Sequence, residues 1–571
     1  MNLNSQFSFY PPQPDNPDDA VRHMLTLYAL SQKGWPGDFG IIMKLMAPPP
    51  PITTYVRPGE FKGIKVGVIG GGLAGLSAAY ELRKAGFDIT VFDALEDRVG
   101  GRIYTCYFDE GKKFYNEFGP MRIPVSHETV WHYIKLFNLP TRPFIQVDAN
   151  AYVYLKKIRV RNDLQGINVM KYIYPKYALT NKERHINWQG LLFKGTDNHL
   201  LNATLEDRSE IIRVLQYYRD RTVFWSSNSN INMMEAAGLS QEAINLVSNF
   251  NPLLYGGLYN SFIDFIEEDY TANLAFLYEI PGGMQKLPLA FYKTFLLRQP
   301  YESIPAEYTG SVFYKAGCWI NEINFDLLSN KIKLRYRNPR TKKSAEEIFD
   351  YVICAIPFST LRNIHVDPLF SNIKMRAIRE VNYIPAQKSL LMCSERFWEK
   401  EGIAGGGSFT DLPIASVWYP SDHAKLINDP LNPLSQFGNL PWNEPGVFIG
   451  SFNFNLDTTR LTNQPQELYF EEIKREVEMV HGLQPGYLDN IVVGHKTVNW
   501  DEQPTIRGAI SFFTPQQKIL FSYGMAQPEY NGRMFFAGEH ISAVHRWMQG
   551  ALQSGMQAAN NLALACKYNF K

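Results

Sequence analysis

The sequence predicts an α/β protein that begins with a Rossmann-like dinucleotide-binding unit, and three adjacent features support this fold class. Residues 65–69 form a short apolar run typical of a buried strand, and residues 76–85 have a helical pattern that ends at Gly86. Between them lies Gly70-Gly-Gly72-Leu-Ala-Gly75, with the Gly-x-Gly-x-x-Gly spacing of a phosphate-binding turn. A second strand over residues 88–92 completes a β-α-β unit.

The glycines explain what this turn can bind. They allow the backbone to turn tightly and to approach a pyrophosphate, which lies at the positive end of the following helix. Asp93 ends the second strand, about 20 residues after the glycines, where an acidic residue binds a ribose hydroxyl. A glycine triplet alone also occurs in ordinary tight turns, so the prediction depends on the whole strand–helix–strand–acid pattern.

Length and composition exclude several classes of protein. A chain of 571 residues is long enough for two or three lobes, and a net charge of +1 gives no support for nucleic-acid or membrane-surface binding. Five dispersed cysteines without a Cys-x-x-Cys pair indicate buried thiols rather than a metal or disulfide centre. Residues 1–19 lack the basic segment and the apolar segment of a secretory signal peptide, and no apolar run is long enough to span a membrane. We therefore expect a cytoplasmic protein without a metal.

Helical patterns dominate two further regions. Residues 18–32 read as a capped amphipathic helix, followed by a proline spacer before the first strand. Residues 155–270 read as an inserted helical lobe, in which residues 210–219 and 241–248 are helical and Ser240 is the N-cap of the second helix. Residues 261–269 end in three acids, for which a solvated helix end is the simplest interpretation.

Two motifs connect the chain to a known family. Arg98-Val-Gly-Gly101-Arg102 follows the second strand and resembles the Arg-x-Gly-Gly-Arg motif of the flavin amine oxidases, which indicates FAD as the cofactor. The segment Gly119-Pro-Met-Arg122-Ile-Pro124 resembles the L-amino-acid oxidase subgroup. Its prolines make it rigid, and an arginine on a rigid segment suits bidentate recognition of a carboxylate. An arginine without this context would more often be a surface residue.

The resemblance implies a FAD-binding domain of the two-dinucleotide-binding type, a mixed-sheet substrate domain and an inserted helical domain. The expected segments are an N-terminal extension packing on the substrate domain (1–60), the FAD-binding domain (61–115, 271–380 and 529–571), the substrate domain (116–154 and 381–528) and the helical domain (155–270).

The resemblance also implies which residues contact FAD. These are Gly70, Gly72, Leu73, Ala74, Gly75, Asp93, Ala94, Gly101, Arg102, Gly119, Pro120, Met121, Arg122, Ile320, Gly538, Glu539, Trp547, Met548, Gln549 and Ala551. The start of the C-terminal helix would point at the flavin, where the helix dipole stabilises negative charge. No cysteine lies near His540, so we expect non-covalent FAD.

In the substrate site, the resemblance implies that Arg122 binds the substrate carboxylate and that Lys388 holds a water at flavin N5. It also implies that Trp547 forms an aromatic wall of the site. Ile510 occupies a substrate-facing aliphatic position, and Phe452, or Ser451 in a shifted register, stands where relatives carry a tyrosine. Two other positions differ from the family pattern. Arg546 stands where the family usually has glycine, and Glu267 or Glu268 stands where the venom-type enzymes have a histidine in the substrate funnel. An acid in the funnel would favour basic substrates.

These observations predict a FAD-dependent L-amino-acid oxidase that uses O2 and forms a 2-oxo acid, ammonia and H2O2, with Arg122, Lys388 and Trp547 as catalytic residues. The partners would be an L-amino acid and O2, and the resemblance implies a homodimer. Two alternatives remain open. One is an amino-acid 2-monooxygenase, which decarboxylates its substrate to an amide. The other is a flavoprotein that acts as a non-catalytic binding module.

Overall fold

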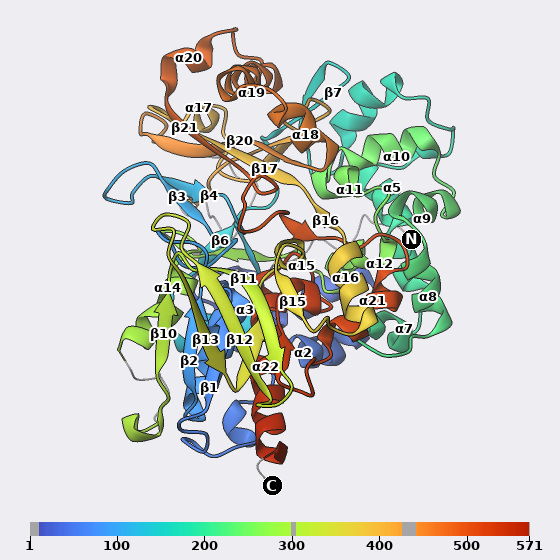
Figure 1. Ribbon diagram of the computed structural model, residues 1–571. Helices are drawn as coiled ribbons and strands as arrows, with labels where there is room; N and C mark the ends of the chain where they lie inside the picture. Colours follow the sequence, from blue (N-terminus) through green and yellow to red (C-terminus); the bar gives the residue numbers. More distant parts are fainter. Residues whose placement is uncertain (1–10, 298–303, 425–440, 570–571) are drawn as a thin grey trace.

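The computed structural model describes residues 11–297, 304–424 and 441–569 of the chain, which form three lobes (Figure 1). A parallel sheet lies in the lower part of Figure 1, a larger mixed sheet in the upper part, and a helical lobe at the right. The prediction that residues 1–19 carry no secretory signal falls partly on residues 1–10, outside the described part. Within the described residues, no helix combines the length and apolarity needed to cross a bilayer.

The first lobe is built on a five-stranded parallel sheet, as the predicted β-α-β unit requires. Its strands, in spatial order, are β10 (Val312–Lys315), β2 (Asp88–Phe92), β1 (Lys65–Ile69), β14 (Tyr351–Cys354) and β23 (Met534–Phe536). The predicted strands 65–69 and 88–92 are confirmed residue for residue. Because β1 has a neighbouring strand on each side and lies between α3 (Leu73–Lys84) and a second sheet, against which Gly67 packs at Leu334 and Phe349, residues 66–69 are buried, which explains their apolar run.

Two helices pack against each other beneath this sheet. α3 (Leu73–Lys84) starts three residues earlier than predicted, directly after Gly72, and every residue in it is buried. The long C-terminal helix α22 (Met548–Asn569) crosses it closely, since a Cβ atom at Gly555 would lie 2.3 Å from the Ala74 carbonyl oxygen. A second sheet beside this lobe contains β13 (Ser344–Phe349), β12 (Lys331–Arg337), β11 (Trp319–Asp326) and β15 (His365–Asp367).

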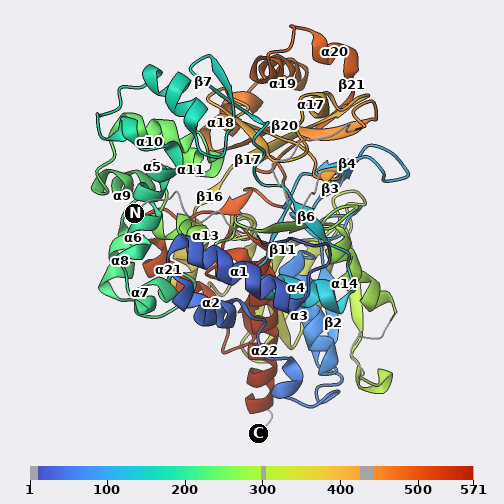
Figure 2. The same ribbon diagram turned by 180° about the vertical axis from the view of Figure 1, so that it is seen from behind.

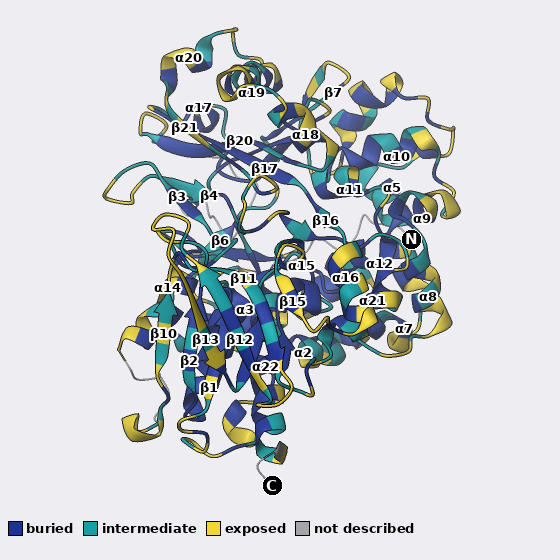
Figure 3. Ribbon diagram, in the orientation of Figure 1, coloured by how far each residue is buried: buried dark blue, intermediate teal, exposed yellow. Residues whose placement is uncertain are grey.

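The second lobe is a seven-stranded mixed sheet covered by helices. Its spatial order is β21 (Val492–Asn499), β17 (Ala386–Cys393), β20 (Gly446–Phe454), β19 (Ser416–Trp418), β18 (Gly407–Thr410), β7 (Tyr152–Leu155) and β8 (Ile158–Arg161). The covering helices are α17 (Phe397–Lys400), α18 (Leu456–Thr462), α19 (Gln466–His481) and α20 (Tyr487–Ile491). Figure 3 shows the inner strands of this sheet buried and the outer surfaces of its helices exposed.

The third lobe consists of short helices. They are α5 (Trp188–Gly195), α6 (Asp197–Leu201), α7 (Leu205–Glu210), α8 (Asp220–Ser227), α9 (Asn230–Ala236), α10 (Gln241–Ser248), α11 (Pro252–Gly256), α12 (Phe262–Phe265) and α13 (Glu267–Tyr270). Ser240 caps α10 by accepting the Ala243 N–H, as predicted. The predicted helix over 210–219 is wrong, because α7 ends at Glu210 and the chain turns before α8. The predicted lobe boundary at residue 155 falls inside the β7–β8 hairpin, so the helices begin later.

The N-terminal segment crosses the back of the molecule (Figure 2). It contains α1 (Asp19–Lys33), capped by Asp18 as predicted, and α2 (Phe39–Met46). Arg22 pairs with Glu128, within the predicted substrate-domain segment, whereas Lys33 reaches the helical lobe. The segment therefore joins several parts of the fold.

Short elements complete the connections. The strands are β3 (Thr105–Tyr107), β4 (Tyr115–Glu117), β5 (Ile123–Pro124), β6 (Arg142–Phe144), β9 (Leu277–Glu279), β16 (Tyr383–Ile384) and β22 (Ile510–Ser511). The helices are α4 (Glu128–Leu136), α14 (Lys286–Leu296), α15 (Phe358–Leu361), α16 (Asn372–Glu380) and α21 (Gln517–Ala526). The segment from β4 to β5 is non-helical, as its prolines predicted.

Candidate active site

Arg122 lies on the predicted rigid segment and has no acidic partner in contact within the described residues. Its Nη1 donates to the Gln146 side-chain oxygen at 2.5 Å, and its guanidinium lies over the Trp418 ring at 5.2 Å from the centroid. Burial lowers the pKa of Arg122 to about 10, opposed by the nearby Glu268 carboxylate. A guanidinium held by a neutral amide and an aromatic face keeps donors available for an incoming carboxylate.

Lys388 is buried in β17, with 3% of its surface exposed, so it is not the exposed strand-end lysine that its sequence position first indicates. Its Nζ donates to the Gly119 carbonyl oxygen at 2.7 Å and the Glu117 carbonyl oxygen at 3.2 Å. The Phe452 ring covers the same nitrogen at 4.4 Å. These contacts join β17 to the segment that carries Arg122.

The register of β20 decides between Phe452 and Ser451. Phe452 is the cross-strand partner of Lys388 and faces the site. The Ser451 hydroxyl instead donates to Gln387 on the opposite face of the sheet, at 3.1 Å. The alternative in which Ser451 serves the site is therefore wrong, and Phe452 offers no hydroxyl to a carboxylate.

Glu267 and Glu268 are buried and Asp269 is half-buried, so the interpretation as a solvated helix end is wrong. Glu267 is 1% exposed and Glu268 is 9% exposed. Burial raises the pKa of Glu267 to about 8, and Arg546 partly opposes this shift. Asp269 points away from these two and pairs with Lys33 at 2.9 Å, whereas Asp264, which the sequence analysis missed, joins them.

Arg546 lies among these three acids. Its nitrogens approach Asp264, Glu267 and Glu268 at 3.5 Å each, and its shortest contact is 2.7 Å to the Asp264 backbone carbonyl. Ion pairs of normal strength are shorter, so Arg546 neutralises the cluster without gripping any one acid. The backbone of Arg546 has φ +70°, which favours glycine, the residue that the family resemblance implied at this position.

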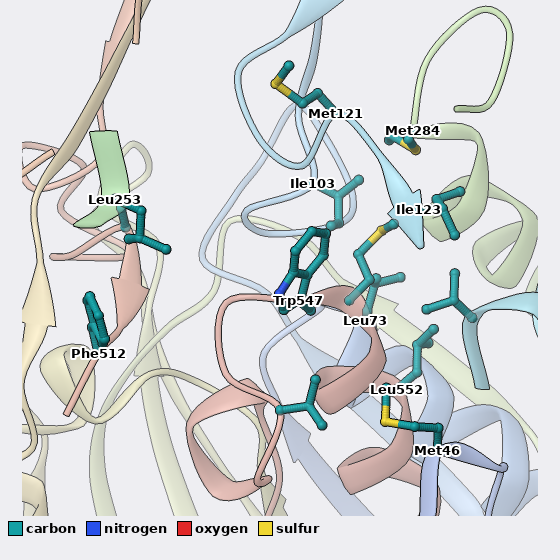
Figure 4. Packing of buried hydrophobic residues seen from close by; sticks show 14 of the residues in the cluster. Met46, Leu73, Ile103, Met121, Ile123, Leu253, Met284, Phe512, Trp547 and Leu552 are labelled. Carbon is teal, nitrogen blue, oxygen red and sulfur yellow. The ribbon is translucent and has the colours of Figure 1, made fainter. Parts of the chain in front are cut away.

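Trp547 closes the other side of the site, immediately before α22. Its indole Nε1 donates to Glu268 at 3.1 Å, and its ring meets His127 edge-to-face at 5.0 Å. Figure 4 shows Trp547 in the part of the core that also holds Ile103, Leu73 and Met121. The structure thus links Arg122, Glu268 and Trp547, which are far apart in the sequence.

The glycine-rich segments lie against each other at the start of α3. Gly72 precedes α3 without providing a side-chain cap, and a Cβ atom there would meet nothing within 4 Å. Gly101 lies beside it, since a Cβ atom at Gly101 would be 3.4 Å from the Gly72 Cα. The first-turn N–H groups of α3 are therefore available to an anion, as binding of a pyrophosphate requires.

Further residues of the predicted FAD site are held by hydrogen bonds to neighbouring groups. Glu539 accepts from the Arg102 guanidinium at 2.8 Å and from the Arg546 backbone N–H at 3.0 Å. The Arg102 charge, the nearby histidines and the Ser511 hydroxyl overcome burial and hold the pKa of Glu539 at about 2. Ser511, next to Ile510, donates to the same carboxylate. Asp93 accepts from the Tyr314 hydroxyl at 2.5 Å.

At two positions the structure limits how the residue could contact the cofactor. The Trp319 indole donates to the Ala94 carbonyl at 3.0 Å, which places Ile320 near the end of β2. The Gln549 side chain donates to the Met46 carbonyl at 2.7 Å and accepts from the Thr129 N–H, so only its backbone remains for a cofactor. The cofactor contacts of all these residues stay predictions.

A cavity opens beside the site. It has a volume of about 630 Å³, its open mouth included. Residues of the mixed sheet and of the connecting strands β4, β6 and β9 line it, among them Trp418 and Glu117, together with Met121. The ion pairs Arg142–Glu279 and Arg396–Asp422 lie on its wall. Sequence reasoning missed Gln146 and Glu117. Glu117 lies two residues before the Gly119–Pro124 segment, whereas no pattern pointed to Gln146.

Comparison with known proteins agrees with this geometry. The family described as flavin-containing amine oxidoreductase matches residues 73–563, and the chain belongs to that family. The chain is 28% identical over 504 residues to an L-amino-acid oxidase of Pseudechis australis, covering 88% of this chain and 87% of that protein. It is 30% identical over 498 residues to the YobN protein of Bacillus subtilis (strain 168), covering 86% and 93%. The predicted family resemblance is confirmed.

Solved structures show the same fold at lower sequence identity. Putrescine oxidase in complex with putrescine matches with a TM-score of 0.64 and 15% identity, covering 87% of this chain and 98% of that chain. Cyclohexylamine oxidase from Brevibacterium oxydans IH-35A matches with a TM-score of 0.63 and 14% identity, covering 88% and 99%. These structures show the flavin amine oxidase fold, and the family match shows that the protein is a flavin-dependent oxidoreductase.

Proposed function

We propose that the protein is a FAD-dependent L-amino-acid oxidase, which converts an L-amino acid, O2 and water into a 2-oxo acid, ammonia and H2O2. The single observation that carries this proposal is Arg122. It is a guanidinium without an acidic contact partner in the described residues, on the same rigid segment whose carbonyl groups hold Lys388. A simple amine substrate would have no use for such a group, whereas a substrate carboxylate pairs with it.

The protein residues bind and orient the substrate. Gln146 fixes the direction of the Arg122 guanidinium, and Trp418 covers one of its faces. Trp547 limits the position of the substrate Cα from the other side. The bound FAD would supply the redox chemistry by accepting the α-hydride and passing electrons to O2. Orientation at a preformed site is therefore the main contribution of the chain to the rate.

FAD would be held without a covalent bond by the α3 turn, Gly101, Arg102 and Glu539. The test is denaturation of the purified yellow protein by acid or heat, followed by separation of protein from flavin. Flavin in the supernatant supports the proposal, and flavin that remains on the denatured chain contradicts it.

We further propose a preference for basic amino acids. Asp264, Glu267 and Glu268 bring three carboxyl groups to the site, where His545 contacts Asp264 at 2.8 Å and the Arg546 contacts to all three are long. Glu268 interacts with both Trp547 and Arg122, since it accepts a hydrogen bond from Trp547 and lowers the electrostatic cost of charging Arg122. A substrate ammonium or guanidinium would compensate this carboxylate, whereas an apolar side chain would leave it poorly paired.

A panel of L-amino acids assayed for peroxide tests this preference. We expect arginine or lysine to exceed leucine and phenylalanine, and Glu268→Gln to reduce that bias by about tenfold or more, because an uncompensated polar group costs about 1–3 kcal/mol. Asp269→Asn is the matched control, since Asp269 belongs to the same run of acids but pairs with Lys33 outside the site. A parent enzyme that prefers leucine or phenylalanine contradicts the preference.

The two alternatives have separate signatures. An amino-acid 2-monooxygenase releases carbon dioxide and an amide in place of peroxide and a 2-oxo acid, so product analysis separates the two activities. A non-catalytic binding module would keep its flavin oxidised when amino acids are added without oxygen. The expected homodimer is tested by light scattering of the purified protein.

A further inference from the structure

Lys388 places a cation in the protein interior without a contact ion pair among the described residues. The ligands of its Nζ are the carbonyl oxygens of Gly119 and Glu117, the Met121 sulfur at 3.6 Å and the Phe452 ring. These groups bind an ammonium through dipoles only. A buried cation held by dipoles alone is costly, so its surroundings must contain a compensating charge or lower its pKa.

Glu117 is the complementary group. It is 6% exposed at the end of β4, and its carboxylate accepts from the Met284 N–H at 2.8 Å and the Thr105 hydroxyl at 3.0 Å. Within the described residues, no lysine or arginine forms a contact ion pair with it. Lys388 and Glu117 are thus a buried cation and a buried anion, each lacking a direct partner, and the Glu117 backbone binds the Lys388 nitrogen.

Burial and the surrounding charges shift the pKa values of these two residues in opposite directions. Burial lowers the pKa of Lys388 to about 7, Glu117 raises it, and Arg122 lowers it further. Burial also raises the pKa of Glu117 to about 7, where the Met284 N–H, Thr105 and Lys388 oppose the shift and Glu279 adds to it. From the two strands that flank β17, the cross-strand neighbours of Lys388 are Phe452 and Val498, which are uncharged.

We propose that Glu117 is the counter-charge of Lys388, and that the two residues share protons as one unit that exchanges with solvent through the cavity lined by Glu117 and Met121. In the ion pair the proton is on Nζ. In the neutral pair it has moved to the Glu117 carboxyl group, and a proton that leaves the unit passes to water in the cavity. Glu117 is therefore a positioning residue that acts through Lys388. The inference rests on the proposed function only in taking Lys388 as the group that faces the flavin.

The direct test is infrared spectroscopy of the FAD-loaded protein across the neutral pH range, following the C=O stretch of protonated carboxylic acids. We expect a band that titrates near neutrality and is absent in Glu117→Gln. In Lys388→Met the same band should titrate at least about one pH unit higher, because the carboxylate has lost its cation. Glu476→Gln is the matched control, since Glu476 is another buried acid with a raised pKa, of about 8, and should leave the Glu117 band in place.

The reciprocal test follows Lys388 through flavin reoxidation. Dithionite reduces the flavin without any amino acid, and mixing with O2 then gives the reoxidation rate as a function of pH. In Glu117→Gln the neutral transition of this profile should move to lower pH by at least about one unit, because Lys388 loses the charge that keeps it protonated. Glu117→Asp should move the transition back toward that of the parent.

Identical infrared and reoxidation profiles in the parent and Glu117→Gln overturn the inference, as does a Glu117 band that is unaffected by Lys388→Met. Flavin content and melting temperature of each variant separate these results from a loss of folding. The proposed function is tested separately, because flavin bleaching by amino acids under anaerobic conditions does not depend on the pH profile of reoxidation.

Discussion

At the residue scale, the site is marked by charged side chains that the protein binds through neutral groups. Arg122 is held by an amide and an aromatic ring, and Lys388 by carbonyl oxygens. In contrast, Arg142 and Arg396, on the wall of the neighbouring cavity, each have a carboxylate partner in contact. A charge without a contact partner is available to a ligand, and this difference separates the substrate-binding arginine from the structural ones.

Replacement of Arg122 by alanine should reduce kcat/KM for amino acids by about a hundredfold or more, since it removes charge-assisted hydrogen bonds worth several kcal/mol. Flavin content should be retained. Steady-state kinetics provide the measurement, with Arg142→Ala as a control in which an already paired arginine is lost. Unchanged kinetics in the Arg122 variant would mean that Arg122 is structural.

Replacement of Lys388 by methionine should slow reoxidation of the flavin by O2 more than reduction by substrate. The reason is that the ammonium contributes a positive charge and donors where oxygen acquires negative charge. Stopped-flow absorbance resolves the two half-reactions. Equal effects on both, or no effect, would remove the role assigned to Lys388.

The candidate site residues came from motifs and from the family resemblance, and their roles stay predictions. Prolines pointed to the rigid segment that carries Arg122, whereas the role of Lys388 was implied by the resemblance to the flavin amine oxidases. Gln146 was not predicted, since a glutamine 24 residues away in the chain carries no signal until the fold brings it to Arg122. The burial of Glu267 was also unpredictable, because its main neighbour, Arg546, is 279 residues away.

At the element scale, the start of α3 distinguishes two uses of glycine. Gly75 is required by packing, since a Cβ atom there would lie 1.9 Å from the Gly70 carbonyl oxygen. Gly72 has open space around its Cα and an extended backbone that alanine can adopt. Packing within the protein therefore does not require glycine at this position, whereas the close approach of a bound ligand would.

Gly75→Ala should lower the free energy of unfolding of the apoprotein by about 1–3 kcal/mol, the usual effect of overpacking. Gly72→Ala should leave the apoprotein as stable as the parent but weaken FAD binding. Thermal unfolding with and without added FAD measures both effects. Equal destabilisation of the apoprotein by both substitutions would contradict the assignment of Gly72 to FAD binding.

The N-terminal helix α1 is joined to the helical lobe by Lys33, which contacts Asp197 at 2.8 Å and Asp269 at 2.9 Å. These acids overcome burial and raise the pKa of Lys33 above its ordinary value, so it stays charged. Lys33→Met should reduce stability by roughly 1–3 kcal/mol, because two partly buried carboxylates lose their cation. Lys135→Met, which removes an exposed pair with Asp19, should change the melting temperature little.

Strands and helices with a strong local pattern were predicted well, and elements that depend on tertiary contacts were not. β1 and β2 were exact because a buried central strand is continuously apolar. The helical pattern of residues 210–219 gave no helix after Glu210, where the Glu210 side chain accepts the Arg219 N–H at 3.0 Å and favours a turn. Periodicity alone could not reveal this contact.

At the scale of the whole molecule, the site exists only where the three lobes meet. Lys388 comes from the mixed sheet, Glu267 and Glu268 from the helical lobe, and Trp547 from the start of α22 (Figure 1). The sequence predicted the three lobes and their fold class, because glycine motifs and periodic patterns are local. It could not predict that Arg546 would lie among the acids of the helical lobe, since that arrangement depends on how the lobes pack.

The most direct test of the central claim compares L-lysine with the diamine that lacks its carboxylate, by following flavin bleaching without oxygen in the parent and in Arg122→Ala. If Arg122 binds the substrate carboxylate, L-lysine should reduce the flavin of the parent at least about a hundredfold faster than the diamine, and most of this advantage should disappear in the variant. Equal rates for the two compounds in the parent, or a full advantage for L-lysine in the variant, would contradict the account.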